Sequence, residues 1–212
     1  MTVNFPKWTN QLPAIAALAV VGGGLTVVLA VWYFFSPEFT DVGYMPHQPI
    51  AYSHKLHAGL MGMDCRYCHV NVEVGPHATV PATEVCMNCH KTVRTDSPEI
   101  QKLAAAHDSG MPVHWKKVHL LPDYAFFNHA AHVRVGVGCV SCHGRVDQME
   151  EVRQEKALSM AWCLECHRAP ETALRPTDRV TDMAWTHDPD LAQRLRDEKQ
   201  IAPPTHCSAC HR

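Results

Sequence analysis

Cys65-Arg66-Tyr67-Cys68-His69 is the stretch that decides how this chain folds, because its pattern recurs four more times. The other copies are Cys86-Met87-Asn88-Cys89-His90, Cys139-Val140-Ser141-Cys142-His143, Cys163-Leu164-Glu165-Cys166-His167 and Cys207-Ser208-Ala209-Cys210-His211. Together the five copies contain all ten cysteines of the 212-residue chain. Residues at i, i+3 and i+4 lie on one face of a helical turn, so each copy presents two thiols and one imidazole together.

A C-x-x-C pair followed directly by histidine is the signature of covalent c-type haem attachment. Zinc ribbons, disulfides and thioredoxin-like redox pairs also use C-x-x-C, but none of them requires histidine at the next position. Histidine accounts for 16 of the 212 residues, so five chance matches have a probability on the order of one in a million. The sequence therefore predicts five covalently bound haem c groups.

Each predicted haem takes three residues from its motif. The predicted thioether-forming residues are Cys65, Cys68, Cys86, Cys89, Cys139, Cys142, Cys163, Cys166, Cys207 and Cys210. The predicted proximal ligands of the irons are His69, His90, His143, His167 and His211.

The composition predicts a polypeptide that wraps cofactors instead of building its own core. Only 8% of the residues are aromatic, and 15 prolines are scattered along the chain. The predicted fold is mostly short α-helices and coil wrapped around five c-type haems, with one N-terminal transmembrane helix. Helical composition is recognised at 97–106, where Ser97 is the expected N-cap, and at 146–160 and 190–199.

No charged residue occurs between Leu12 and Phe35. As a helix this segment is about 36 Å long, which spans a hydrocarbon core of roughly 30 Å. A cleaved signal peptide would have an apolar region about half as long, followed by small residues. Here Val31-Trp32-Tyr33-Phe34-Phe35 follows Ala30, so a permanent single-pass anchor over 12–35 is predicted, with a cytoplasmic N-terminus at 1–11.

Haem is attached to such motifs on the exported side of a membrane. Residues 36–212 are therefore predicted to form a haem domain on the periplasmic or outer side of the inner (cytoplasmic) membrane. Lys7, on the short side of the anchor, supports this orientation weakly. Gly22, Gly23 and Gly24 would let another helix approach closely, or they reflect the ordinary frequency of glycine in membrane helices.

The soluble part contains an internal repeat. His54-x-x-His57 precedes the motif at Cys65, and His129-x-x-His132 precedes the motif at Cys139; each of these motifs is followed by another. The repeat predicts two-haem modules at about 47–100 and 119–170, with a fifth haem at 187–212. His54, His57, His129 and His132 are the predicted distal ligands, because histidines at i and i+3 project from one helix face. Neither pair has the adjacent glutamate of a zinc protease.

The distal ligand of the fifth haem is less clearly marked. His119 is the prediction because it lies in an apolar stretch before the second module, and His187 and Met160 are weaker candidates. A thioether ligand such as methionine would raise the reduction potential. If every iron has two protein ligands, none has an open position for a substrate. The chain is therefore predicted to transfer electrons and not to be an enzyme by itself, with no catalytic residue.

The charge balance excludes nucleic acid as a partner. The chain has 19 Lys and Arg residues against 21 Asp and Glu residues. A nucleic-acid-binding surface would require a basic patch or stripe.

These features resemble the pentahaem cytochrome c subunit of alternative complex III, a quinol-oxidising respiratory complex. The resemblance covers nearly the whole chain. It rests on the anchor, Pro49-Ile50-Ala51-Tyr52-Ser53-His54-Lys55-Leu56-His57, Pro81-Ala82-Thr83-Glu84-Val85-Cys86, Leu121-Pro122-Asp123 with Phe127-Asn128-His129, Met160-Ala161-Trp162-Cys163, and Cys207-Ser208-Ala209-Cys210-His211-Arg212.

The modules are also similar to those of class III cytochromes of the c3/c7 type. In that family the first histidine of H-x-x-H binds the following haem and the second binds another haem, which here implies these roles for His54 and His129, then for His57 and His132. The resemblance to alternative complex III implies three kinds of partner: an iron–sulfur/molybdopterin-like subunit, polytopic quinol-binding membrane subunits and a monohaem cytochrome c.

Two other functions compete with a complex subunit. A stand-alone anchored quinol dehydrogenase would place a haem motif sooner after the anchor, whereas Cys65 lies well beyond Phe35 here. A multihaem nitrite or hydroxylamine oxidoreductase would have a catalytic haem. The nitrite enzymes typically carry a C-x-x-C-K motif, which this sequence lacks.

Overall fold

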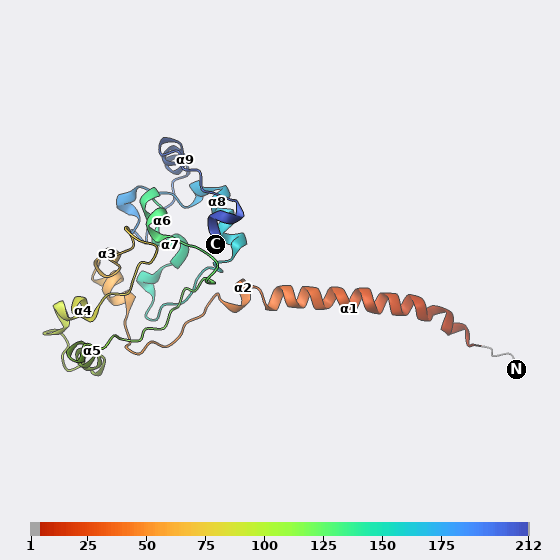
Figure 1. Ribbon diagram of the computed structural model, residues 1–212, viewed down its shortest axis with the longest axis horizontal. Helices are drawn as coiled ribbons and strands as arrows, with labels where there is room; N and C mark the ends of the chain where they lie inside the picture. Colours follow the sequence, from red (N-terminus) through yellow and green to blue (C-terminus); the bar gives the residue numbers. More distant parts are fainter. Residues whose placement is uncertain (1–4, 212) are drawn as a thin grey trace. The chain divides into compact units, whose positions relative to one another are not determined.

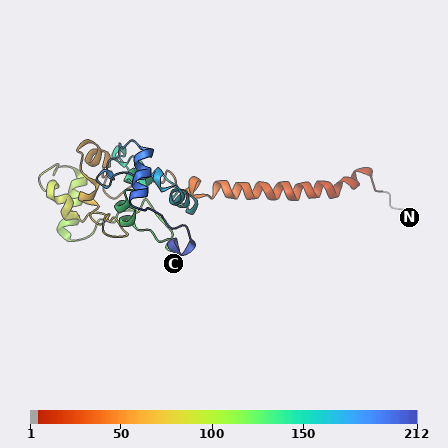
Figure 2. The same ribbon diagram turned by 90° about the horizontal axis from the view of Figure 1, so that it is seen from above.

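The computed structural model describes residues 5–211, and the chain divides into two compact units between Asp41 and Val42. Figure 1 and Figure 2 show the two units from two directions. Unit 1 is the N-terminal helical segment, and unit 2 contains all five C-x-x-C-H motifs.

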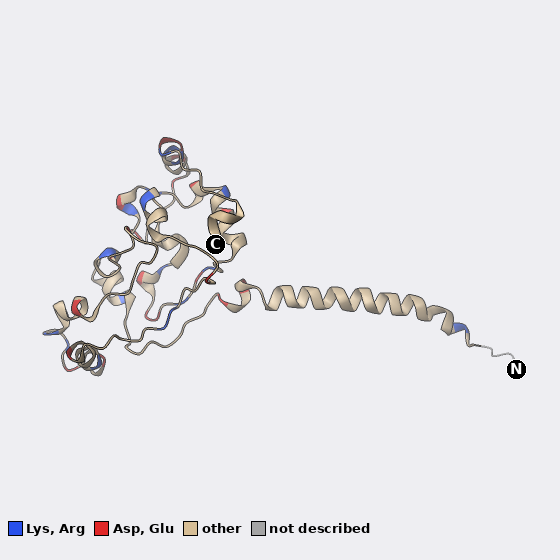
Figure 3. Cartoon of the chain, in the orientation of Figure 1, with Lys and Arg blue, Asp and Glu red and all other residues tan. Residues whose placement is uncertain are grey.

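Unit 1 is built on one long apolar helix. A short 3₁₀ turn, η1 (Lys7–Gln11), leads into α1 (Leu12–Phe34), and α2 (Pro37–Thr40) follows. Proline in the first turn suits a helix start, because its missing N–H has no intrahelical partner there. The helical stretch Lys7–Phe34 contains an 18-residue segment with a mean hydropathy of 2.4 and is long enough to cross a membrane. Figure 3 shows no charged residue along α1.

Unit 2 is made of short helices joined by coil. Its elements are η2 (Lys55–Leu60), α3 (Cys65–Cys68), α4 (Thr83–His90), α5 (Pro98–Ser109), α6 (His129–Val135), α7 (Cys139–His143), η3 (Val146–Gln148), α8 (Met160–Arg168), η4 (Pro170–Thr172), η5 (Thr177–Arg179), α9 (Pro189–Glu198) and α10 (Cys207–Cys210). Within residues 5–211 the β-structure consists of two isolated bridges, Ala125 with His211 and Val137 with Leu174. The prediction of helices and coil without strands agrees with this architecture.

Two of the three predicted soluble helices are present. The segment 97–106 corresponds to α5, which runs on to Ser109 and ends at Gly110 in the left-handed conformation. The segment 190–199 corresponds to α9. Its start is capped by the side chain of Asp188, which accepts a hydrogen bond from the Leu191 amide.

The prediction of a helix over 146–160 is wrong. Only the 3₁₀ turn η3 forms there, and α8 begins at Met160. The backbone of 149–154 instead bonds to the first residue of η2 and to the chain before it. Lys55 donates to the Met149 carbonyl, Gln154 donates to the Tyr44 carbonyl, and Gly43 donates to the Gln154 carbonyl. These tertiary contacts, together with the burial of Met149 and Gln154, outweigh the local helix propensity.

The buried side-chain core of unit 2 is thin. The buried apolar residues are Ile50, Leu103, Ala130, Val133, Met149, Ala157, Ala173, Leu174, Val180, Met183 and Ala192, and four of these are alanines. A domain of about 150 residues ordinarily buries about 70% of the surface that its unfolded chain exposes. Side chains alone therefore account for little of the interior that a unit of this size requires.

The best-packed part of this core surrounds Leu174 and Arg175. Leu174 is 2% exposed, and the Arg175 guanidinium donates to the carbonyl of Asp182 and faces the ring of Trp185. Gly136 ends α6 with a φ of 102°, and its carbonyl accepts a hydrogen bond of 2.9 Å from the amide of Arg175. A Cβ at this glycine would collide with the Arg175 carbonyl oxygen, so the close approach requires glycine.

Candidate haem-binding sites

All five C-x-x-C-H motifs lie on helical turns. We number them site 1 (Cys65–His69), site 2 (Cys86–His90), site 3 (Cys139–His143), site 4 (Cys163–His167) and site 5 (Cys207–His211), in chain order. Sites 1, 3 and 5 are themselves the short helices α3, α7 and α10, whereas sites 2 and 4 lie within α4 and α8. All ten cysteines are free, so each pair of thiols is available to one cofactor edge.

Four of the motif histidines face a predicted distal histidine. The ring centroids are 6.5 Å apart for His54 and His69, 6.2 Å for His57 and His90, 6.3 Å for His129 and His143, and 6.1 Å for His132 and His167. The interplanar angles are 5° and 8° for the first pair of each module, against 62° and 41° for the second pair. The sequence repeat is therefore also a repeat in three dimensions.

These separations fit one metal ion between two imidazoles. A metal–imidazole nitrogen bond is about 2 Å long and the ring centroid lies about 1 Å behind that nitrogen, so two rings on opposite sides of one ion stand roughly 6 Å apart. A direct hydrogen bond between the rings would bring them closer than this. The spacing thus leaves room for an iron in each of the four pairs.

The hydrogen bonds of the histidines fix which ring nitrogen is free. The five motif histidines and the five predicted distal histidines make ten imidazoles. In seven of them Nδ1 lies within hydrogen-bond distance of a backbone carbonyl oxygen, at 2.6 to 3.3 Å: His57, His69, His90, His129, His132, His167 and His211. A neutral imidazole that donates from Nδ1 keeps the lone pair of Nε2 for a metal. Metal-bound histidines in proteins commonly show this outer hydrogen bond.

Burial favours the neutral form of four of the paired imidazoles. Burial and, to a smaller extent, the neighbouring histidines lower the pKa of His143 to about 3 and that of His54 to about 4. The pKa values of His129 and His132 are also lowered, again mainly by burial. A neutral ring is the form that binds iron.

His54 also has an orphaned polar atom. Its Nδ1 is buried and has no hydrogen-bond partner, which is unusual for a buried polar group. Together with the spacing of the pairs and the thin core, this supports a site completed by a group other than side chains. The residues present therefore fit c-type haem at sites 1 to 4.

An aromatic residue bridges the two histidines of each module, and the sequence analysis missed it. The ring of Tyr52 lies 4.8 Å from the ring of His54 and 4.5 Å from that of His57. Phe127 occupies the same place in the second module, 4.8 Å from His129 and 4.6 Å from His132. Both aromatics stand two residues before the first histidine of H-x-x-H, a shared offset that marks them in the sequence.

Site 5 is built differently. The backbone of α10 pairs with the segment before the second module: Phe126 donates to the Cys210 carbonyl, and the ring of His211 lies 5.8 Å from that of Tyr124. Within the described residues no ring contact joins His119 to His211. His119 instead places Nε2 3.3 Å from Nδ1 of His143 at site 3.

The two weaker candidates for a distal ligand lie on the surface. Met160 is 65% exposed at the start of α8. His187 is exposed just before α9.

Comparison with known proteins points to the same chemistry. Residues 125–212, which contain sites 3 to 5, match the family described as "Cytochrome c7 and related cytochrome c". A stretch of 121 residues, 57% of this chain, is 38% identical to the menaquinone reductase multihaem cytochrome c subunit of Nitratidesulfovibrio vulgaris. The chain covers 56% of that relative, little more than half of its length. Both comparisons show that this chain is similar to multihaem cytochromes c.

Proposed function

We propose that this chain is a membrane-anchored cytochrome c that carries five haems and passes electrons between them as a subunit of a quinone-linked membrane complex. The observation that carries the proposal is the set of four facing imidazole pairs, with ring centroids 6.1 to 6.5 Å apart, each beside a C-x-x-C-H turn. The similarity to a multihaem subunit of a menaquinone reductase supports the quinone-linked part.

The residues have distinct roles in this proposal. The ten cysteines hold the haem edges and His69, His90, His143, His167 and His211 bind the irons from the proximal side. His54, His57, His129 and His132 bind the irons of sites 1, 2, 3 and 4 from the distal side. Haem bound by two imidazoles cycles between two iron oxidation states at low potential. Two imidazoles at each of these sites would leave a bound haem no open position for a substrate, so the chain would move electrons and leave substrate chemistry to other subunits.

Site 5 has three assigned residues in this proposal: Cys207, Cys210 and His211. The contact of His119 with His143 favours a supporting role at site 3 over the distal position that the sequence analysis predicted. Redox potentiometry of His119 variants separates the two roles.

Unit 1 is proposed to anchor the protein in the inner membrane, with unit 2 on the periplasmic or outer side. The helix Lys7–Phe34 supports the anchor by its length and hydropathy. The side of the membrane follows from the chemistry of c-type haem attachment, which takes place after export.

Two kinds of complex remain as candidates. The sequence resembles the pentahaem subunit of alternative complex III, which would oxidise quinol with an iron–sulfur/molybdopterin-like subunit, polytopic quinol-binding subunits and a monohaem cytochrome c as partners. The relative in N. vulgaris belongs instead to a menaquinone reductase. In both complexes the proposed task of this chain is the same, namely to carry electrons between other subunits.

Purification of the full chain from its native membrane in mild detergent tests the proposal. We expect an intact mass that includes five haems, haem that stays bound in acid acetone, a low-spin spectrum for sites 1 to 4, and co-purifying membrane subunits. Reduction of the haems by menaquinol in the complex would favour quinol oxidation, and reoxidation by menaquinone would favour quinone reduction. A chain without haem would refute the function, and a lone chain that oxidises quinol would favour the stand-alone dehydrogenase.

A further inference from the structure

Resting on the proposed haem sites, we infer that the five sites form one row in the order 2, 1, 3, 4, 5. This order differs from the order along the chain, in which site 2 stands between sites 1 and 3. It makes site 2 on α4 and site 5 on α10 the two ends of unit 2. Hydrogen bonds and ring contacts between segments that are distant in the chain define this order.

Sites 1 and 2 are neighbours because one turn supplies a histidine to each. His54 directly precedes η2 and His57 lies within it, and both rings contact the ring of Tyr52. The helices of the two sites also meet, since the side-chain amide of Asn88 lies 3.3 Å from the hydroxyl of Tyr67. Sites 3 and 4 are neighbours for the same reason, through α6 and Phe127.

Site 3 approaches the module of site 1 through two neighbouring residues. The hydroxyl of Thr181 donates to the carboxylate of Asp64, which directly precedes site 1, at 3.1 Å. The carbonyl of Val180 accepts a hydrogen bond from the amide of Cys139, at 3.0 Å. The first cysteines of sites 1 and 3 are thereby held beside each other.

A second set of bonds joins the same two sites. The carbonyl of Pro76, shortly after site 1, accepts hydrogen bonds from both the amide and Nδ1 of His129, at 3.2 and 2.7 Å. The amide of Ala130 donates to the carbonyl of Gly75. The chain that leaves site 1 thus supports the helix that carries the distal histidine of site 3.

Site 5 lies beside site 4. The carbonyl of Pro204, three residues before Cys207, accepts a hydrogen bond of 2.7 Å from Nδ1 of His167 at site 4. The proximal histidine of site 4 is therefore oriented by the segment that leads into site 5. The amide of Lys55 donates to the carbonyl of Met149, shortly after site 3, but Lys55 lies in the turn η2 that sites 1 and 2 share. Within residues 5–211, the helix α4 of site 2 makes no such bond to the helices of sites 3, 4 or 5.

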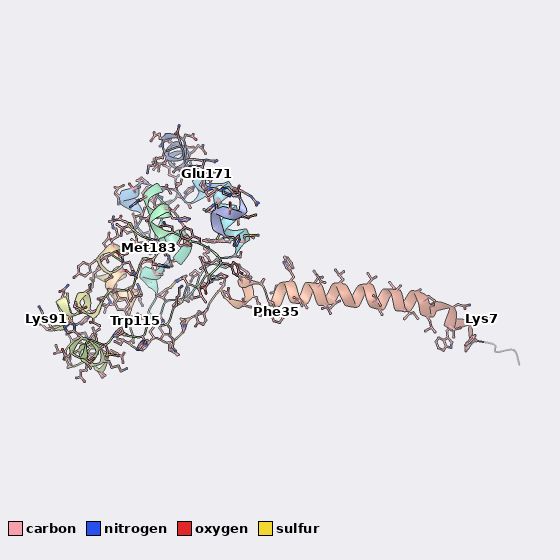
Figure 4. The ribbon with its side chains drawn as sticks, in the orientation of Figure 1. Lys7, Phe35, Lys91, Trp115, Glu171 and Met183 are labelled. Carbon is pink, nitrogen blue, oxygen red and sulfur yellow. The ribbon has the colours of Figure 1, made fainter. Side chains whose placement is uncertain are left out.

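The exposure of the cysteines agrees with a row in which sites 2 and 5 are the ends and sites 1, 3 and 4 lie between them. Cys89 of site 2 and Cys207 of site 5 are exposed, whereas the other eight are partly buried. Figure 1 places α4 and the C-terminus on opposite sides of unit 2, with α3 and α7 between them. In Figure 4, Lys91 after site 2 and Glu171 after site 4 lie apart, with Met183 between them.

The row gives each end a separate role. Partners that bind near α4 and near α10 would exchange electrons with sites 2 and 5, respectively. Transfer from one partner to the other would then use every site. Sites 1 and 3, which are adjacent only in space, form the single link between the two modules.

Redox titration of the full chain can count how many haems are adjacent to a given site, because each adjacent haem shifts its midpoint potential when that site is altered. His57→Met and His132→Met replace an imidazole by a thioether at site 2 and at site 4, which raises the potential of that haem. The substituted haem then stays reduced while the others titrate, and its extra electron lowers the midpoint potential of each adjacent haem by Coulomb repulsion. We expect one lowered midpoint in His57→Met and two in the matched variant His132→Met.

The outcomes separate this inference from the proposed function. Chain order predicts two lowered midpoints in both variants, so two in His57→Met would overturn the row, and one in His132→Met would overturn the link to site 5. If His57→Met gains no absorption band of methionine-bound ferric haem, the proposed ligand itself is wrong. If the variants do not assemble, a density map of the unaltered chain in its complex decides: a haem on Cys86 and Cys89 lying between two others refutes the row.

Discussion

Removing the imidazole of His119 tests whether this residue supports site 3 or binds the iron of site 5. With iron on Nε2 of His143, the hydrogen of that ring lies on Nδ1 and points at Nε2 of His119, 3.3 Å away. The other four proximal histidines give this hydrogen to backbone carbonyls. His143 is therefore the proximal ligand whose outer hydrogen bond can be removed by a side-chain substitution.

The expected change follows from the worth of one hydrogen bond. An acceptor on Nδ1–H makes the imidazole a stronger electron donor to iron, which favours the ferric state. A net hydrogen bond contributes about 0.5–1.5 kcal/mol. If the hydrogen bond stabilises the ferric state over the ferrous state by this full free energy, loss of the bond raises the reduction potential of one haem by about 20–65 mV. The conversion follows because a tenfold change in a one-electron equilibrium corresponds to about 59 mV.

Redox potentiometry of the full-length His119→Leu and His119→Gln variants, with spectra recorded at each potential, is the assay. We expect His119→Leu to raise one midpoint, whereas His119→Gln retains an acceptor oxygen and stays closer to the unaltered protein. All haems that are low-spin before the substitution should remain so. The reasoning is refuted if both variants produce a new high-spin haem, which would make His119 the distal ligand of site 5, or if neither variant moves any potential.

Three further predictions concern the fold and the anchor. Leu174→Ala, at a side chain only 2% exposed, should lower the free energy of unfolding of the haem-loaded protein by about 2–5 kcal/mol, as measured by denaturant titration. The same titration should show almost no change for Leu60→Ala, whose side chain is 75% exposed. Gly136→Ala, at a φ of 102° and against a carbonyl oxygen, should lower the melting temperature more than Gly110→Ala, where φ is 67° and the surrounding space is open; equal shifts would contradict the close approach described above. Replacing residues 1–41 by a cleavable export signal should release unit 2 into the soluble fraction with an unchanged number of haems per chain, as counted from its mass; haem loss would show that unit 1 is needed for assembly.

Local signals made most of the fold predictable. The prediction of an apolar helix from Leu12 agrees with α1, because a long uncharged run depends on no distant residue. The helix at 97–106 was recognisable from Ser97 and Pro98 at its start, and the helix at 190–199 from its composition. The segment 146–160 was not, because its conformation is set by backbone bonds to Gly43, Tyr44 and Lys55, and no local pattern reports those.

The same division holds for the candidate sites. The five attachment motifs were predictable without the structure, since two thiols and an imidazole that meet within one helical turn need only their spacing. The family resemblance had already implied that His54 and His129 serve the sites that follow them. The folded chain was needed to show that His57 faces His90, that His119 contacts His143, and that site 1 adjoins site 3. These relations join residues that are distant in the chain, so they exist only once the coil between the helices has taken its path.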